Sequence, residues 1–202
     1  EVHICGRRGS VLETTAEEIA GETGGQIFTH SVDIRDAEAV DEMIAAIWHH
    51  SGPLTGLVNN AAGQIMSPTN KLSTRGFDAV AATVFHGTYY TTHSVGRRWI
   101  DEGLKGNIIS ILVTWIWSGS PYVVPSAMSK AGIHTMTKSL AVEWAQYGIR
   151  LNAIAPGPFP TDGAWARLHP EATPGDEEQD VARVPMGRYG KMHELRNLAV
   201  FL

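Results

Sequence analysis

The sequence predicts an α/β protein built on a doubly wound parallel sheet, and three observations lead to that fold class. Segments typical of strands and of helices alternate along all 202 residues. Segment 107–113 is apolar in the way of a strand that helices cover on both faces. Apolar residues make up 43% of the chain and 21 residues are glycine, which is typical of globular α/β domains. Strands alternating with helices form parallel sheets with helices on both faces.

The elements are expected in the following order. Five strands are predicted at 2–5, 26–32, 54–58, 107–113 and 149–155. The first helix should begin at Ser10, which has capping-box spacing to Glu13, and Gly24 should end it. Asp36 is expected to cap the second helix. That helix carries an apolar stripe of Val40, Met43, Ile44 and Ile47.

Two long helices follow the third and fourth strands, at 73–101 and 125–147, and a last helix begins at 192. The 125–147 helix carries an apolar stripe of Ile133, Met136, Leu140 and Trp144. No repeat, linker or low-complexity tract divides the chain, so residues 1–202 are expected to form a single domain. Because Glu1 opens directly on a strand, we expect a fragment of a longer protein.

Charge and composition argue against several classes of function. The net charge is −5, and no run of lysine and arginine exceeds two, which argues against nucleic acid as a partner. The longest apolar run, 108–117, is too short to span a bilayer. A single cysteine, Cys5, excludes an internal disulfide, fits a reducing compartment and is expected to be buried. The nine histidines lack the spacing of metal sites, so no metal is expected.

Polar or glycine-rich segments follow all five predicted strands. Arg7 and Arg8 follow the first strand, Asp33 the second, and NNAAG (59–63) the third. The loop after the fourth strand leads to Ser126 and Lys130, which are four residues apart and therefore share one helix face. PGPFPT (156–161) follows the fifth strand. Ligands bind at the carboxyl ends of the strands in such sheets, so this edge is the predicted binding site.

Several of these segments carry a family resemblance. NNAAG, SAMSKAG (126–132), IRLNAIAPGP (149–158) and Thr161 occur in the order and spacing of the short-chain dehydrogenase/reductase family, and the resemblance covers essentially the whole chain. NNAAGQIMSPTNKLS, YVVPSAMSKAG and GAWARL are more specifically similar to NADPH-dependent 2,4-dienoyl-CoA reductases of the mitochondrial and bacterial type. The resemblance implies a Rossmann-like sheet that here lacks the first βα unit and the last strand of the family. It also implies NADP(H) as the cofactor and an acyl-CoA-like substrate.

The resemblance implies catalytic roles for Lys130, Ser126 and Trp115. Lys130 would reach the ribose next to the nicotinamide, and Ser126 would hydrogen-bond the thioester carbonyl. Many relatives have a tyrosine four residues before the lysine; in this subfamily a serine stands there, and the tyrosine lies earlier, at the position of Trp115. Trp115 is expected to donate the hydrogen bond that the tyrosine gives, or else to line an acyl pocket. Two asparagines of relatives fall on Gln64 and His86.

The resemblance also implies the cofactor and substrate contacts. Arg7 and Arg8 follow Gly6, where NAD-specific relatives hold a carboxylate, which favours the 2′-phosphate of NADPH. Asp33 would accept a hydrogen bond from the adenine, and Asn59 would tie strands together. The expected cofactor-binding residues are Arg7, Arg8, Asp33, Ile34, Asn60, Ala61, Gly63, Lys130, Pro156, Gly157, Phe159 and Thr161. The expected substrate-binding residues are Gln64, Ile65, Ser73 and Arg167.

The leading hypothesis is NADPH-dependent reduction of an unsaturated acyl thioester in fatty-acid β-oxidation. Two alternatives stay open: a ketoreductase of the 3-oxoacyl reductase kind, and a family member that binds a nucleotide or a partner without turnover. The resemblance implies a homo-oligomer, a tetramer formed through the 73–101 and 125–147 helices. A cytoplasmic location is expected, and a mitochondrial one stays open. Neither membrane insertion nor nucleic-acid binding is expected.

Overall fold

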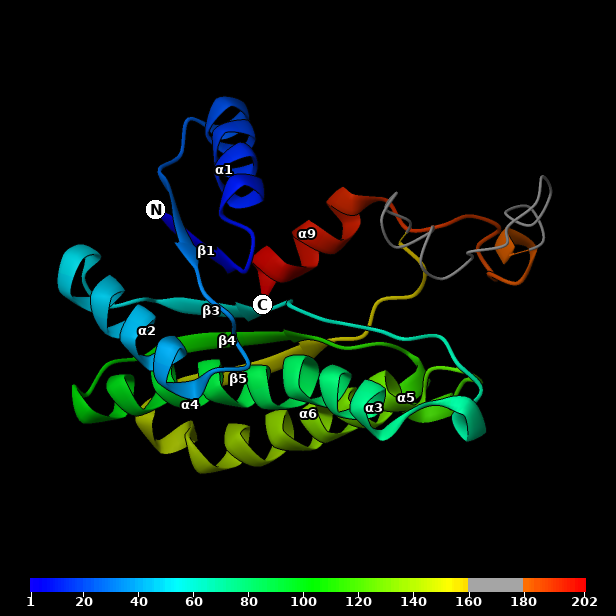
Figure 1. Cartoon of the computed structure of the whole chain (residues 1–202). Coiled ribbons are helices and arrows are strands. Elements are labelled where there is room, and N and C mark those ends of the chain that lie inside the picture. Colours follow the sequence, from blue (N-terminus) through cyan, green and yellow to red (C-terminus); the bar gives the residue numbers. More distant parts are fainter. Residues whose placement is uncertain (160–179) are drawn as a thin grey trace.

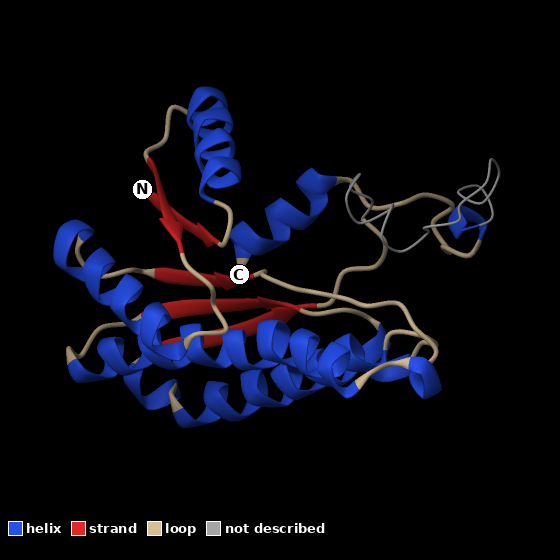
Figure 2. Ribbon diagram, in the orientation of Figure 1, coloured by secondary structure: helices blue, strands red, loops and turns tan. Residues whose placement is uncertain are grey.

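The structure of the chain is a computed structural model that describes residues 1–159 and 180–202 (Figure 1, Figure 2). Its strands are β1 (Val2–Gly6), β2 (Ile27–Ser31), β3 (Gly56–Asn59), β4 (Gly106–Ile111) and β5 (Ile149–Ile154). Its α-helices are α1 (Gly9–Thr23), α2 (Ala37–Ser51), α3 (Thr74–Ala81), α4 (Gly87–Asp101), α5 (Trp115–Ser118), α6 (Val124–Glu143) and α9 (Met192–Phe201). Shorter turns are η1 (Thr69–Lys71), η2 (Ala82–His86) and η3 (Ala145–Tyr147). The predicted alternation of strands and helices is confirmed.

All strand pairings are parallel, but they form two sheets where the sequence predicts one. β1 pairs with β2, and β4 lies between β3 and β5. Within the described residues, β1 and β3 are not hydrogen-bonded to each other, and Figure 1 shows the β1–β2 pair standing away from β3. The chain steps from β1 outward to β2, returns through α2, and then steps the opposite way from β3 to β4 and β5. The strand order therefore reverses at this opening, where doubly wound sheets bind ligands.

Packed helices cover the three-stranded sheet on one face. α4 and α6 lie against that face, and α2 flanks α4 (Figure 1). α1 and α9 lie on the other side, and neither has a buried residue. Helices with buried residues on both faces, which the apolar fourth strand predicts, are therefore not found in the described part of the chain.

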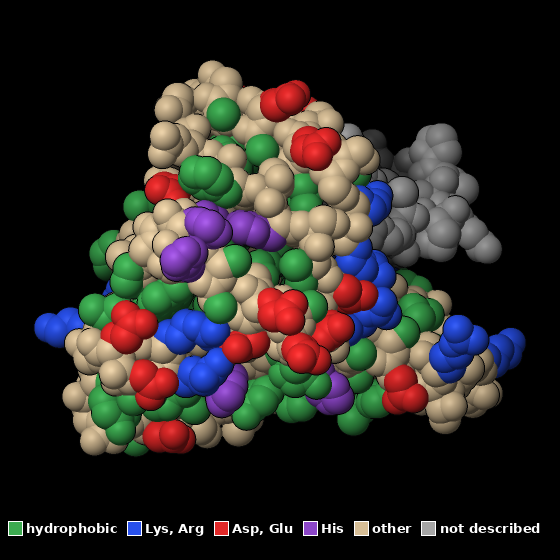
Figure 3. Space-filling model, turned by 60° about the vertical axis from the view of Figure 1, so that its left-hand side comes forward, with side chains coloured by type: hydrophobic (Ala, Val, Ile, Leu, Met, Phe, Trp, Pro, Cys, Tyr) green, Lys and Arg blue, Asp and Glu red, His purple; other side chains and the backbone are tan. Residues whose placement is uncertain are grey.

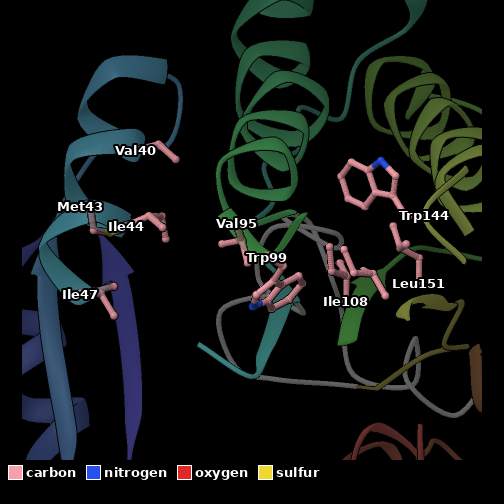
Figure 4. Close-up of a cluster of buried hydrophobic side chains, with 10 residues drawn as sticks. Val40, Met43, Ile44, Ile47, Val95, Trp99, Ile108, Trp144 and Leu151 are labelled. Atoms are coloured by element: carbon pink, nitrogen blue, oxygen red, sulfur yellow. The ribbon is translucent and has the colours of Figure 1, made fainter. Parts of the chain in front are cut away.

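The main core lies between α2, α4, α6 and the three-stranded sheet. The apolar stripe of α2 faces Val95 and Trp99 of α4, while Trp144 at the C-cap of α6 and Leu151 of β5 complete the cluster (Figure 4). The cluster consists of Val40, Met43, Ile44, Ile47, Val95, Trp99, Ile108, Trp144, Ile149 and Leu151. A smaller cluster nearer α5 consists of Val80, Val84, Leu112 and Ile133. The stripe predicted for α2 is confirmed, because all four of its residues are buried.

The helix ends test the capping predictions. The Asp36 carboxylate accepts hydrogen bonds from the backbone N–H groups of Glu38 and Ala39 at 3.0 and 3.1 Å, as predicted. Gly24 ends α1 with a φ of 68°, also as predicted. The start predicted for α1 is wrong: the helix begins at Gly9, without a side-chain cap, so that Ser10 lies inside its first turn.

The helix predicted at 73–101 is interrupted by the π-helical turn η2. A π turn holds an extra residue and shifts the side chains that follow it. Directly after η2, Gly87 lies so close to the loop after β2 that a Cβ there would be 2.6 Å from Ile34 Cδ1. Further along α4, a Cβ on Gly96 would be 2.4 Å from the Trp144 ring. Glycines therefore set the close approach of α4 to its neighbours.

The surface bears on three sequence-based expectations. Within residues 1–159 and 180–202, no helix is both long enough and apolar enough to cross a bilayer. Acidic and basic side chains are mixed on the face in Figure 3, which fits the moderate net charge of −5. Cys5 is exposed, so the prediction that it is buried is wrong. The reason is that the β1–β2 pair lacks the two-sided cover that would enclose Cys5.

Candidate functional site

Ser126 and Lys130 lie in the first turns of α6, beside the carboxyl end of β4. The Lys130 Nζ donates a hydrogen bond to the carbonyl oxygen of Leu112, just after β4, at 3.1 Å. Burial lowers the pKa of the Lys130 ammonium from its usual value. Ser126 is only 4% exposed, and its hydroxyl has no hydrogen-bond partner in the described part of the chain. The two residues thus bring an ammonium and an unengaged hydroxyl to the edge where a ligand is expected.

Trp115 is the first residue of α5, in the loop that joins β4 to α6. The indole N–H groups of Trp48 and Trp99 are used within the fold: they donate to Glu102 Oε1 at 2.9 Å and to the Leu54 carbonyl at 2.6 Å. Trp115 is half-buried, and no residue of the described ranges accepts a hydrogen bond from its indole N–H. That N–H is therefore free to donate, in the loop that leads to Ser126.

Three of the expected substrate-binding residues are brought together between β3 and α3. Ser73 caps α3, its hydroxyl accepting a hydrogen bond from the Gly76 N–H at 3.1 Å. A Cβ on Gly76 would lie 3.2 Å from Ser73 Oγ and 3.5 Å from Ile65 Cδ1, so these side chains are neighbours. Gln64 directs its amide to the Met66 sulfur at 3.3 Å. The hydroxyl of Ser73 is therefore engaged as a helix cap rather than directed at a substrate.

Asn59 anchors the segment after β3, although not in the expected way. Its side chain donates to Thr92 Oγ1 at 2.9 Å and accepts from Thr91 Oγ1 at 2.7 Å. Both partners belong to α4, so Asn59 ties a strand to a helix rather than strand to strand. Asn60 and Ala61 are exposed just beyond it. Their backbone is thus open to a ligand while Asn59 holds its position.

The residues expected near the adenosine end lie on the two-stranded sheet. Arg7 and Arg8 are exposed, and no hydrogen bond or ion pair within the described residues takes up their guanidinium groups. Asp33 is already engaged: the Arg35 Nε donates to both of its carboxylate oxygens at 2.9 Å. This pairing lowers the pKa of Asp33. An adenine amino group would have to share Asp33 with Arg35. Ile34 contacts α4 at Gly87.

The segment after β5 is held from the C-terminal part of the chain. The Gly190 N–H donates to the Pro158 carbonyl oxygen at 3.0 Å. The Phe159 ring lies directly on Gly190, where a Cβ would be 2.3 Å from it. Pro156 is half-buried and Gly157 is exposed, next to the end of β4 through the β4–β5 pairing. Thr161 and Arg167, the other two residues predicted here, lie outside the described residues.

Two groups of donors result, one at each end of the strand edge. The exposed guanidinium groups of Arg7 and Arg8 suit phosphate, and the donors on α5 and α6 suit an oxygen at a reacting centre. Along the same edge, a Cβ on Gly63 after β3 or on Gly157 after β5 would meet nothing within 4 Å among the described residues. This donor set fits a nicotinamide dinucleotide. In the same described ranges, no group of three or more histidine, cysteine, aspartate or glutamate side chains could hold a metal ion.

Two features of the site region were missed by sequence reasoning. The backbone N–H of Ser67 donates to the Tyr122 carbonyl oxygen at 3.0 Å, which joins the loop after β3 to the loop before α6. Tyr122 has a φ of 67°, in the left-handed region. No turn motif in the sequence marks either feature, because tyrosine is not a residue that favours this region.

Comparison with known proteins agrees with this geometry. The whole chain, residues 1–202, matches the family model described as Enoyl-(Acyl carrier protein) reductase. A probable 2,4-dienoyl-CoA reductase of Caenorhabditis elegans is 40% identical over 202 residues, which are 100% of this chain and 65% of that protein. A short chain dehydrogenase from Bacillus anthracis has a structure with a TM-score of 0.86 at 39% identity, covering 99% of this chain and 77% of that one.

A gluconate 5-dehydrogenase from Burkholderia cenocepacia, solved in complex with NADP and tartrate, has a TM-score of 0.89 at 28% identity. That match covers 99% of this chain and 76% of the dehydrogenase. The chain spans 64% of one curated Caenorhabditis elegans relative and 65% of two others.

Proposed function

Since the chain belongs to the short-chain dehydrogenase/reductase family, we propose that the protein is an NADPH-dependent oxidoreductase that reduces an unsaturated acyl thioester, as a 2,4-dienoyl-CoA reductase does. The observation that carries the proposal is the convergence of Lys130, Ser126 and Trp115 at the carboxyl end of β4. The identity to dienoyl-CoA reductases supports the substrate class. In this proposal residues 1–202 act as one domain, and the pathway served is fatty-acid β-oxidation.

Each residue has a separate task in the proposed reaction. When bound, the dihydronicotinamide supplies a hydride. Lys130 binds the ribose beside it and fixes its orientation. Ser126 and Trp115 donate hydrogen bonds to the thioester oxygen, on which negative charge develops. An indole N–H is a donor only, which suits an oxygen that gains charge. Donors fixed in advance stabilise such charge more than water does, because they need not reorganise.

The cofactor is proposed to be NADP(H) rather than NAD(H). The support is the free pair Arg7 and Arg8 at the end of β1, since guanidinium groups bind a 2′-phosphate bidentately. The dissociation constants of the intact protein for NADPH and NADH, measured side by side, test this. NADPH should bind more tightly, and Arg7→Ala combined with Arg8→Ala should remove the difference. Equal constants in the parent protein would overturn the preference.

The test of the reaction is the loss of NADPH absorbance when the intact protein meets a 2,4-dienoyl-CoA. A β-ketoacyl thioester is the parallel substrate, because a 3-oxoacyl ketoreductase is the second candidate. Gluconate is a third, tested in the oxidative direction with NADP⁺ as a gain of NADPH absorbance, since the chain resembles gluconate 5-dehydrogenase. Binding of NADPH without turnover of any of them would favour the non-catalytic alternative. The presence of Trp115 where relatives have a tyrosine supports that alternative.

The role of Trp115 is tested with two variants. Trp115→Phe removes the donor and should lower turnover of the dienoyl-CoA by about a hundredfold. Trp115→Tyr restores a donor and should retain far more activity than the phenylalanine variant. If Trp115→Phe is as fast as the parent protein, Trp115 only lines the acyl pocket.

We also propose a homotetramer in a reducing compartment. The support for assembly is a row of exposed rings from η2 into α4: Phe85 and Tyr89 are 39% and 47% exposed, and Tyr89 stacks on His93 at 5.7 Å. An exposed aromatic row on a helix is a common contact between copies of a chain. Light scattering of the intact protein at micromolar concentration tests this, and a monomer there would refute it. The cytoplasm is the proposed compartment, with the mitochondrion as the alternative.

A further inference from the structure

Two histidines on the β1–β2 pair face each other through their ring nitrogens. His3 Nδ1 lies 2.9 Å from His30 Nε2. The other nitrogen of His3, Nε2, lies 3.0 Å from Glu1 Oε1. The side chain of His3 is only 9% exposed, and its ring stacks on Phe28 with the ring centroids 5.0 Å apart. The fold therefore holds the His3 ring with one nitrogen directed at His30 and the other at a carboxylate.

The Glu1 carboxylate selects which nitrogen of His3 carries the proton. A neutral imidazole has one N–H, so an Nε2–H that donates to Glu1 leaves a lone pair on Nδ1. Burial is the main cause that lowers the pKa of His30, and it favours the neutral ring there too. With its proton on Nδ1, His30 presents an Nε2 lone pair toward His3. A carboxylate that accepts the second N–H of a histidine is the usual partner of a metal-binding histidine.

The spacing of the two facing nitrogens fits one class of metal ion. Two metal–nitrogen bonds of about 2.0–2.1 Å that meet at a right angle hold their nitrogens about 2.9 Å apart. That is the distance between His3 Nδ1 and His30 Nε2. Square-planar and octahedral ions such as Cu²⁺ and Ni²⁺ have ligands at right angles, whereas the tetrahedral angle of Zn²⁺ needs about 3.4 Å. The pair therefore suits Cu²⁺ or Ni²⁺ better than Zn²⁺.

A cavity beside the pair has room for the remaining ligands. Its volume is about 470 Å³, and it lies between the two strands and the end of α2, where His50 and Ser51 line it. A water molecule takes up about 30 Å³, so several waters fit. Among the described residues, no group of three or more histidine, cysteine, aspartate or glutamate side chains could hold a metal ion. The protein therefore supplies two ligands, and water supplies the others.

We propose that His3 Nδ1 and His30 Nε2 bind a divalent transition-metal ion of the Ni²⁺ and Cu²⁺ class, with Glu1 as the carboxylate that orients His3. The ligands are 27 residues apart and come from neighbouring strands, so no metal-binding spacing marks them in the sequence. The ion links β1 to β2 in a unit whose helix α1 buries none of its residues. Its role is structural, because a ligand that binds only the folded state stabilises that state.

Calorimetric titration of the intact protein with NiCl₂ tests the ligands. The parent protein should bind one Ni²⁺ per chain at this site. Glu1→Gln should weaken binding about tenfold, since it removes the carboxylate behind His3, and His3→Ala and His30→Ala should weaken it more. His193→Ala is the matched control, because His193 is exposed on α9, and it should bind as the parent does. Parent-like binding by both His3→Ala and His30→Ala overturns the proposal.

Two measurements on the parent protein need no variant to fold. With half an equivalent of CuCl₂, the nitrogen splittings in the electron paramagnetic resonance spectrum should count two bound imidazoles. Saturating NiCl₂ should slow hydrogen exchange in β1 and β2 and leave β4 unchanged. A count of one imidazole or none, or unchanged exchange in β1 and β2, overturns the site. Neither readout involves NADPH or a thioester, so each outcome stands apart from the proposed function.

Discussion

The β1–α1–β2 unit and the β3–β4–β5 sheet with its helices are built from the same kinds of element but differ in burial. α1 buries none of its residues, whereas α4 buries eight. β4 has three consecutive buried residues, and β1 has none. Burial of apolar side chains is the main stabilising term of folding, so the free energy of unfolding depends mostly on the second region.

The candidate site divides in the same way. Arg7, Arg8 and Asp33 lie on the weakly buried unit, and Ser126 and Lys130 lie on the well-buried one. A ligand that binds the folded state stabilises what it contacts, by mass action. The groups expected to hold the cofactor phosphates therefore lie where the fold gains most from a ligand, while the reacting centre is held by the core itself.

The largest effect is expected for a residue in the core of the second region, the β3–β4–β5 sheet with its helices. Trp99 is fully buried, and its indole N–H donates to the Leu54 carbonyl, so Trp99→Ala leaves both a cavity and an unpaired acceptor. The loss should be about 3–5 kcal/mol in the free energy of unfolding measured with urea. Val11→Ala on α1, where Val11 is 44% exposed, should cost less than about 0.5 kcal/mol. Similar losses for the two variants would contradict the comparison.

A pair of glycines should respond with opposite signs. A Cβ on Gly96 of α4 would lie 2.4 Å from the Trp144 ring, so Gly96→Ala should destabilise the fold by about 1–3 kcal/mol. A Cβ on Gly21 of α1 would meet nothing within 4 Å, so Gly21→Ala should gain up to about 1 kcal/mol from helix propensity. Thermal unfolding of both variants tests this. Destabilisation by Gly21→Ala would mean that α1 packs more tightly than described.

The smallest expected effect is a dependence of stability on pH that is confined to the β1–α1–β2 unit. His3 Nδ1 lies 2.9 Å from His30 Nε2 across β1 and β2, beside a cavity of about 470 Å³ that Glu1 and His50 also line. Histidines gather on the corresponding face in Figure 3. Burial, and next the charge of His3, lowers the pKa of His30. The folded state thus binds fewer protons than the unfolded state just below the usual histidine pKa of about 6.5.

The contribution of His30 to the stability of the β1–β2 strand pair should therefore be fully present above pH 6.5, and it should decrease as the pH falls below that value. Hydrogen exchange at pH 7.5 and pH 5, corrected for intrinsic rates, should show protection lost in β1 and β2 but not in β4. His30→Asn should remove the pH dependence. Equal losses in β4 would assign the effect to the whole fold.

Local features could be predicted from the sequence because short-range chemistry decides them. The cap at Asp36 and the apolar stripe of α2 need only neighbouring residues, and both are confirmed. The capping box of Ser10 and Glu13 has the same spacing rule, but the chain leaves β1 through Arg8 directly into the helix, so tertiary context overrides it. The exposure of Cys5 could not be foreseen either, because it depends on what covers β1.

In the site, too, some features could be predicted from the sequence and others depend on tertiary contacts. Order along the chain placed Ser126 and Lys130 at a strand end, since parallel strands bring their carboxyl ends to one edge. The engagement of Asp33 by Arg35 and the left-handed backbone of Tyr122 depend on side-chain geometry and on contacts between loops distant in sequence. No residue pattern encodes such contacts.

The opening between β1 and β3 has a consequence for how the chain behaves in concentrated solution. Each of these strands has one edge whose backbone donors and acceptors pair with no strand in the described part of the chain. Such edges act as templates for further strands, including those of other molecules. Val2 and Val58, on the two open strands, are 51% and 57% exposed and add apolar surface. When residues 1–202 are produced alone, edge-to-edge aggregation should therefore begin at these strands, and a lysine at either valine should raise the concentration at which it starts.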